Sequence, residues 1–153
     1  MRSQRSPNRW SCLPTSFAMV LDVAVEALII QLGHDGSQIL WPDLPEPYRR
    51  RGFHIQEMID FSWHLGYTVT QFEALPVSQG RADVQPIAIP MRWAPSERLK
   101  SVMSVCNGVI TGETLRGQPH AVAWDKNSCL DPNGETYNLE QFRLQCFWAI
   151  KSS

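Results

Sequence analysis

Residues 11–21 read SCLPTSFAMVL, a cysteine and a proline followed at once by apolar residues with helical spacing. Pro14 suits the first turn of a helix, where its missing N–H group would have no partner in any case. The apolar spacing continues to Ile29 and covers most of the helix circumference, which indicates a buried helix. With Gly33 as its stop, the sequence predicts one central helix from Pro14 to Gly33.

Cys12 stands just before this helix, where the positive end of the dipole and the unpaired N–H groups favour a thiolate. A thiolate is the form of cysteine that attacks a carbonyl carbon, and such a nucleophile works with a neighbouring base. Taken alone, however, a free cysteine is more often a packing residue of the core. A catalytic interpretation of Cys12 therefore depends on finding its partners.

His120 is the candidate base, and Asp131 is the candidate acid beside it. Residues 119–124, PHAVAW, have the composition of a strand, and residues 125–128, DKNS, have that of a turn. A hairpin that folds at 125–128 brings Asp131 back alongside the start of the first strand. A thiol, an imidazole and a carboxylate that orients the imidazole form the nucleophile, base and orienting group of acyl-transfer enzymes.

The run from Cys12 to Leu21 resembles the cysteine-helix motif of papain-like cysteine peptidases. The match is closest to the bacteriocin-leader-processing branch, whose pattern is Cys-Gly-Pro-Thr/Ala-Ser/Ala-Leu-Ala-Met-Val-Leu. Residues 120–123, HAVA, and 131–134, DPNG, are similar to the later motif of that branch, a strand-borne histidine and then Asp-Pro before a glycine turn. The resemblance implies a papain-like fold, a Cys12, His120 and Asp131 triad, and a peptide or protein substrate.

Two positions depart from the family pattern. Leu13 replaces the glycine that follows the nucleophile, which narrows the approach to the thiol. Ser6 stands where the family has a glutamine that donates to the oxyanion, about six residues before the cysteine. Gln4 or Asn8 can supply that amide if the loop between them bulges, because the oxyanion needs a donor about 3 Å away rather than a fixed sequence offset.

These departures leave three functions open. A thiol peptidase or isopeptidase is the first, because the motifs are most similar to those of peptidases. A deamidase or transglutaminase uses the same triad with a different groove and second substrate. A chain without a working oxyanion donor would instead be a papain-like binding or inhibitory protein.

The order of the remaining elements predicts an α+β fold. Helical patterns come first and antiparallel strands follow, which matches the two parts of the papain-like arrangement, about 1–66 and about 67–153 in one domain. We expect a loop at 33–51, a helix at 54–65, a strand at 67–72, an edge strand at 84–92, a helix at 96–106, strands at 109–113, 120–124, 129–131 and 146–150, and a helical turn at 138–143. Asn107 and Gly108 also permit a tight hairpin in place of the helix end at 96–106. Trp41 and Tyr48 either line a substrate groove or pin the long loop to the core.

The composition narrows the possible classes of protein and of binding partner further. The chain has 153 residues, of which 43% are hydrophobic, enough for one globular domain with a substantial core. A net charge of −1 and a pI of about 6.4 argue against a general attraction to nucleic acid or to an anionic membrane. The short basic cluster 49–51 is better explained as a solvated turn than as a phosphate site.

No cofactor is expected from the sequence. The four cysteines contain no CxxC pair and the histidines no HExxH spacing, so neither a metal nor a redox site is indicated. Residues 1–9 lack the apolar core of a secretion signal, and Asp22 and Glu26 interrupt the longest apolar stretch. We therefore expect a cytoplasmic protein with free thiols.

Overall fold

The computed structural model describes residues 1–46, 49–74 and 95–153, which form an α+β fold as predicted. In chain order, its elements are α1 (Cys12–Leu21), α2 (Val25–Leu32), α3 (Ile55–His64), β1 (Tyr67–Glu73), α4 (Pro95–Met103), β2 (Gly108–Thr114), β3 (Pro119–Trp124), β4 (Cys129–Leu130), β5 (Thr136–Tyr137), the short 3₁₀ helix η1 (Leu139–Gln141) and β6 (Phe142–Ser152). The expected edge strand at 84–92 and the side chain of Tyr48 lie outside the described residues.

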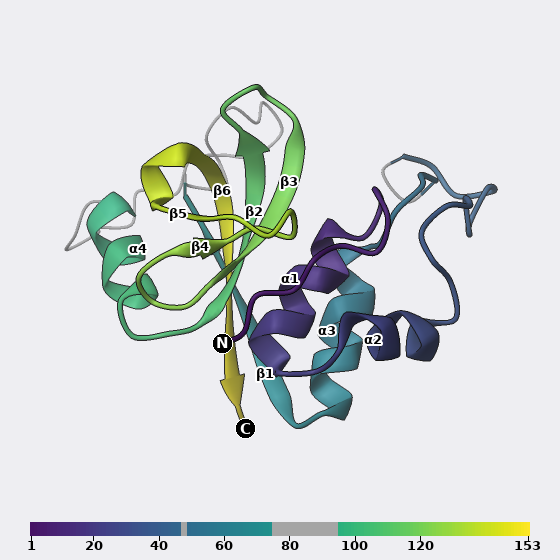
Figure 1. Ribbon diagram of the computed structural model, residues 1–153, viewed down its shortest axis with the longest axis horizontal. Helices are drawn as coiled ribbons and strands as arrows, with labels where there is room; N and C mark the ends of the chain where they lie inside the picture. The colour runs from purple at the N-terminus through teal and green to yellow at the C-terminus, as the bar shows by residue number, and fades with distance from the viewer. Residues whose placement is uncertain (47–48, 75–94) are drawn as a thin grey trace, which may run out of the picture.

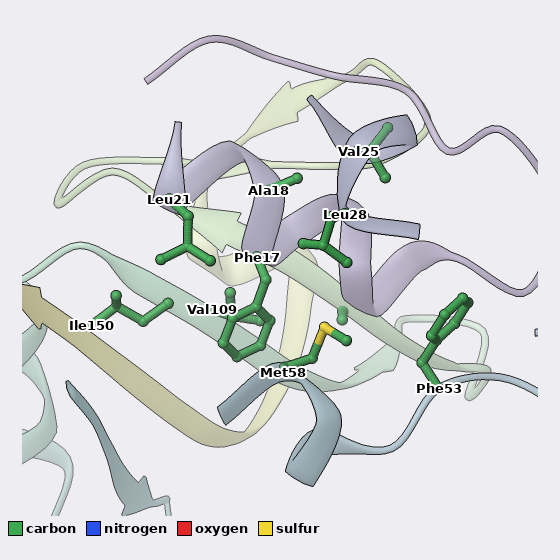
Figure 2. Close-up of a cluster of buried hydrophobic side chains, with 10 residues drawn as sticks. Phe17, Ala18, Leu21, Val25, Leu28, Phe53, Met58, Val109 and Ile150 are labelled. Carbon is green, nitrogen blue, oxygen red and sulfur yellow. The ribbon is translucent and has the colours of Figure 1, made fainter. Parts of the chain in front are cut away.

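The strands named above form one antiparallel sheet in the order β1-β6-β2-β3-β4-β5 (Figure 1). Figure 1 shows α1, α2 and α3 on one side of this sheet and α4 on the other. Because successive side chains of a strand point to opposite faces, the neighbours Val109 and Ile110 of β2 enter different cores. Figure 2 shows the first core, in which Phe17 of α1 and Met58 of α3 gather around Val109.

The prediction of a single helix from Pro14 to Gly33 is wrong. The chain forms two helices, α1 and α2, which are bent by 117° to each other. Asp22 ends α1 in the left-handed conformation, with φ of 56°. The Gln4 side chain then caps α2: its Nε2 donates to the Val23 carbonyl at 2.7 Å, and its Oε1 accepts from the Val25 N–H at 2.9 Å. A residue distant in the sequence thus stabilises the break, against the local helical spacing.

Within the described ranges, no single helix is long and apolar enough to cross a membrane. The bent pair α1 and α2 passes that test together, on length and composition alone.

The other predicted elements agree with the structure except near the end of the chain. α3, β1 and α4 occupy the segments predicted for them, and the segment at 96–103 is a helix rather than part of a hairpin. β6 begins at Phe142 and not at residue 146, and the helical turn covers only residues 139–141. The two-residue strand β5 was not predicted, because two residues carry no alternation of apolar and polar side chains.

A bulge in β6, where the register skips Gln145, lies opposite the residue of β2 that pairs with the candidate base. The register of β2 against β6 shifts between Thr111 and Gly112, and Gly112 pairs with His120 of β3. A Cβ atom at Gly112 would overlap the carbonyl oxygen of Arg143 in β6, so only glycine fits there. Bulges bend a strand locally, and this one lies where β3 presents His120.

Candidate active site

His120 and Asp131 lie side by side, as the hairpin prediction requires. β3 and β4 pair as antiparallel strands, and the Asp125 carboxylate holds the turn between them by accepting from the N–H groups of Asn127 at 3.0 Å and Ser128 at 2.8 Å. The His120 Nε2 atom and the Asp131 Oδ1 atom are 2.9 Å apart. The structure thus brings together the base, in β3, and the acid, in the residue that follows β4.

Asp131 is a buried carboxylate, 3% exposed, that accepts hydrogen bonds on both oxygens. Its Oδ1 accepts from His120 and from the Asn133 N–H at 2.9 Å, and its Oδ2 accepts from the Tyr137 hydroxyl at 2.5 Å. Burial raises the pKa of Asp131, but the bonds from His120, Tyr137 and Asn133 outweigh it and hold that pKa below its ordinary value. The carboxylate is therefore ionised at neutral pH.

Cys12 is the third member of this group. Burial lowers the pKa of His120, but the hydrogen bonds and negative charges of Asp131 and Cys12 raise it to about 9. Since Nε2 of the ring faces Asp131, Nδ1 is the ring nitrogen left for the Cys12 sulfur. The structure therefore brings together all three residues that the sequence singles out, from α1, β3 and the end of β4.

The start of α1 leaves backbone donors beside the thiol. Ser11 is the N-cap residue, and its side chain makes no capping hydrogen bond. The N–H groups of Cys12 and Leu13 have no acceptor within the helix, because they belong to its first turn. Cys12 itself is only partly buried. These donors and the helix dipole favour negative charge at the thiol or next to it.

The structure does not bring Gln4 to Cys12. Its side chain caps α2 beyond the C-terminal end of α1, whereas Cys12 is the first residue of α1. α1 has 10 residues, so its two ends are about 15 Å apart. Both polar atoms of the Gln4 amide are already bonded there, and this geometry gives Gln4 a structural role.

Asn8 lies next to the helix start. Its Oδ1 accepts from the Trp10 N–H at 2.9 Å and from the Ser11 hydroxyl at 3.0 Å. Its Nδ2 donates to the Asp35 carbonyl at 3.0 Å. An amide nitrogen carries two hydrogens, so this bond leaves Asn8 with a second N–H. Of the two amides that the sequence suggested as oxyanion donors, Asn8 alone is bonded to the residue before Cys12.

Ser6, where the papain-like pattern has a glutamine, holds the N-terminal segment in place. The Thr15 hydroxyl donates to the Ser11 carbonyl at 2.6 Å, so Ser6 Oγ is the donor in its own contact with Thr15 Oγ1 at 3.2 Å. The Ser6 N–H donates to the Pro132 carbonyl at 2.8 Å. Ser6 thus connects α1 to the turn that follows Asp131.

A groove of about 710 Å³ reaches the start of α1, where Leu13, the residue after Cys12, forms part of its lining. Its walls come from the start of α1, the loop before α3, α3 itself, β2 and β6, and its lining consists of Leu13, Trp41, Leu44, Arg50, His54, Ile55, Gln56, Glu57, Asp60, Thr111 and Trp148. Trp41 lines this groove, as one of its two sequence interpretations suggested, and its ring contacts that of His54 at 4.8 Å between centroids.

No metal centre is found in the part of the chain that the structure describes: no three or more His, Cys, Asp or Glu side chains gather there in a way that could hold an ion. The four cysteines are free thiols.

Comparisons with known proteins add no assignment. No family model matches the chain, and no curated protein or solved structure matches it. A functional interpretation therefore depends on the residues and geometry around Cys12.

Tyr137 is the functional residue that the sequence interpretation missed. Tyr137 lies in β5 and pairs with Cys129 of β4. This pairing places the Tyr137 hydroxyl next to Asp131, to which it donates a hydrogen bond. The signal was present in the turn 131–134, DPNG, because Gly134 with φ of 95° turns the chain back on itself. A hairpin built on that turn would have placed Tyr137 beside the β3–β4 pair.

Proposed function

We propose that this chain is a cysteine-dependent acyl-transfer enzyme with a papain-like fold, which hydrolyses a peptide or isopeptide bond in a peptide or protein substrate. Cys12 is its nucleophile, His120 its base and Asp131 the group that orients the base. The observation that carries this proposal is the hydrogen bond between Asp131 and His120, together with a thiol at a helix start that helps to raise the pKa of the same imidazole. Positioned groups of this kind are what acyl transfer requires.

The first half of the reaction forms a thioester. With a pKa of about 9, His120 is protonated at neutral pH, which fits a resting state in which the Cys12 proton has moved to the imidazole. The thiolate attacks the substrate carbonyl carbon, and the carbonyl electrons move onto its oxygen. When the C–N bond breaks, His120 gives its proton to the leaving amine.

The second half releases the acid. His120, now neutral, takes a proton from a water molecule whose oxygen attacks the thioester carbon. The C–S bond breaks, and Cys12 leaves as a thiolate beside the imidazolium. One amide and one water thus become one acid and one amine, and the enzyme regains its starting state.

The oxyanion is stabilised by donors at the start of α1. The N–H groups of Cys12 and Leu13 provide the backbone part, and the second N–H of Asn8 provides the side-chain part. A single such donor contributes on the order of 10²-fold to 10³-fold in rate. Donors that are fixed before the reaction need no reorganisation while charge develops.

A papain-like binding or inhibitory protein is the second candidate. The position of the family's oxyanion glutamine is Ser6, whose hydroxyl and N–H are both bonded within the fold. A deamidase or transglutaminase would share the triad and differ in the acyl donor or acceptor. Acylation of Cys12 separates the enzymes from the binding protein.

Iodoacetamide labelling near pH 6, mapped by mass spectrometry, tests the proposal. An ordinary thiol, with a pKa of about 8.5, is less than about 1% thiolate at this pH. We expect Cys12 to react about 100-fold faster than Cys146, a half-buried free thiol of the same chain that serves as internal control. His120→Ala removes this difference, whereas His64→Ala, at the exposed end of α3, retains it.

Equal labelling of Cys12 and Cys146 in the native protein would overturn the proposal. A second measurement separates enzyme from binding protein. p-Nitrophenyl acetate acylates a thiolate only through an oxyanion, so rapid alkylation without release of p-nitrophenolate favours the binding protein.

A further inference from the structure

The bulge in β6 lies one strand away from the proposed base. The register of β6 against β2 skips Gln145, and the next pair toward the start of β6 joins Leu144 to Gly112. On its other edge, Gly112 pairs with His120 of β3. Opposed residues of an antiparallel pair carry their side chains on the same face of the sheet. A side chain at Gly112 would therefore point to the face that carries the imidazole.

Gly112 allows the backbone of β6 to come close to β2 at the bulge. A Cβ atom at this glycine would overlap the carbonyl oxygen of Arg143, so any larger residue would push the two strands apart. Bulges bend a strand and increase its local twist. The path of β6 beside the base thus depends on Gly112 and Gln145 together.

The first residue of β6 reaches the imidazole directly. The ring of Phe142 is buried, and its centroid lies 6.2 Å from that of His120, with the two planes at 42°. Centroid separations of about 4.5 to 7 Å are typical of aromatic rings that pack together. Phe142 lies three residues before Gln145, so the bend at the bulge determines where this ring meets His120. His120 is therefore linked to the bulge both through Gly112 and through Phe142.

We infer that the bulge formed by Gly112 and Gln145 is a positioning element of the base, which holds the His120 ring where it meets Asp131 and the Cys12 sulfur at once. Nε2 of the ring lies 2.9 Å from Asp131 Oδ1, which leaves Nδ1 for the thiol. A misplacement of about 1 Å slows a reaction on the order of 10²-fold. This inference rests on the proposed function, since it needs His120 to be the base of Cys12.

Gly112→Ala and Gly108→Ala form a matched pair of test variants. Gly108 lies at the other end of β2, where a Cβ atom would overlap the carbonyl oxygen of Trp148 in β6. It pairs with Trp124, which lies four residues, or about 13 Å, along β3 from His120. Both substitutions push β6 away from β2, but only Gly112→Ala does so beside the base.

The rate of Cys12 alkylation by iodoacetamide, measured from pH 5 to pH 10, is the readout. Native protein and Gly108→Ala should react rapidly near pH 6, because the imidazole has taken the thiol proton. In Gly112→Ala the rate near pH 6 should fall at least about tenfold, and it should rise with pH as for an ordinary thiol with a pKa of about 8.5. Cys129, which is 0% exposed, should stay unlabelled in each variant and so reports an intact fold.

Deletion of Gln145 tests the bulge without adding an atom. Gln145 is exposed, and the residue pairs on both sides of it can continue as a regular ladder once it is removed. The deletion variant should lose rapid labelling near pH 6, as Gly112→Ala does, and it decides the matter if Gly112→Ala does not fold. A deletion variant that does not fold, judged by circular dichroism and by labelling of Cys129, would make the bulge a requirement of the whole fold and overturn the inference.

The remaining outcomes separate the two proposals. Rapid labelling of native Cys12 with an unchanged pH profile in folded Gly112→Ala or in the deletion variant overturns the positioning inference and leaves the proposed function standing. An equal loss in Gly108→Ala overturns it as well, because separation of the strands at any point would then have the same effect. Slow labelling of native Cys12 overturns the proposed function, and this inference with it.

Discussion

The two sides of the Cys12 sulfur are built in different ways. On the base side, β3, β4 and β5 supply His120, Asp131 and Tyr137, and both oxygens of the buried carboxylate are bonded. On the helix-start side, the amides of Gln4 and Asn8 form hydrogen bonds that hold the N-terminal segment and α2. In the proposed mechanism the base side transfers the proton, whereas the helix-start side holds the fold and leaves oxyanion binding largely to backbone N–H groups.

Because the two sides differ in this way, alkylation and acylation of Cys12 can be slowed separately. Alkylation of Cys12 needs only a thiolate, so it reports on the base side. Acylation by an ester also needs the oxyanion donors, so it reports on both sides. Variants on the two sides should therefore differ in which reaction they slow.

Asp131→Asn should have the largest effect. It removes the charge that supports the His120 imidazolium, so both alkylation and acylation of Cys12 should fall on the order of 10²-fold. Rates near pH 6, measured with iodoacetamide and p-nitrophenyl acetate, test this. Asp43→Asn, an exposed position in the loop before α3, is the control. Rates of Asp131→Asn within about twofold of the native protein would show that the base side does not act through this carboxylate.

The stability that His120 contributes should depend on pH in the alkaline range. Its pKa is raised from about 6.5 when unfolded to about 9 when folded, so this contribution is complete below about pH 6.5 and is lost as the pH rises through 9. The native protein should have a higher free energy of unfolding than His120→Ala. This difference should be larger near pH 6 than near pH 10, by on the order of 2 kcal/mol. Urea denaturation at both values measures this.

The pH prediction has its own control. His64→Ala should show no such pH-dependent difference, because His64 lies at the exposed end of α3. A difference between native protein and His120→Ala that is the same at both pH values would mean that the imidazolium is not stabilised by folding.

Asn8→Ala and Gln4→Ala compare the two amides of the helix-start side. Asn8→Ala should slow acylation by p-nitrophenyl acetate about tenfold and leave alkylation unchanged, because backbone donors remain. Gln4→Ala should lower the free energy of unfolding by about 1 kcal/mol through loss of the α2 cap, with both reactions of the folded protein unchanged. Slower acylation in Gln4→Ala than in Asn8→Ala would reverse their assigned roles.

Tyr137→Phe should have the smallest effect on the base side. It removes one hydrogen bond to Asp131, so alkylation of Cys12 should fall about fivefold, equivalent to about 1 kcal/mol. The lowered pKa of Asp131 gives stability that is present above about pH 4 and is lost as the pH falls through the folded pKa. Acid unfolding of Tyr137→Phe should therefore begin at a higher pH, and Tyr67→Phe in β1 is the control.

Features held by near neighbours in the sequence could be predicted. The β3–β4 hairpin follows from a four-residue turn between two β-prone runs, and this local signal placed Asp131 beside His120. A helix start at Pro14 was predicted from that proline and the apolar spacing after it, and α1 begins two residues earlier, at Cys12. These elements fold as their own residues dictate.

Features held by distant residues could not be predicted. The break at Asp22 opposes the local helical spacing. It is stabilised by Gln4, which lies 18 residues before Asp22 in the sequence and bonds to Val23 and Val25. The same interaction explains why Gln4 is not at the thiol. Tyr137 was missed for a related reason, since its strand has only two residues and is defined by its partner β4.

β6 lies between β1 and β2, although both precede it in the chain. During translation, the helix that carries Cys12 leaves the ribosome long before this strand. β1 and β2 have no shared partner until residues 142–152 emerge, and pairing between such distant segments is slow. We therefore expect the sheet that holds His120 near Cys12 to be completed late in synthesis, when β6 pairs with β1 and β2.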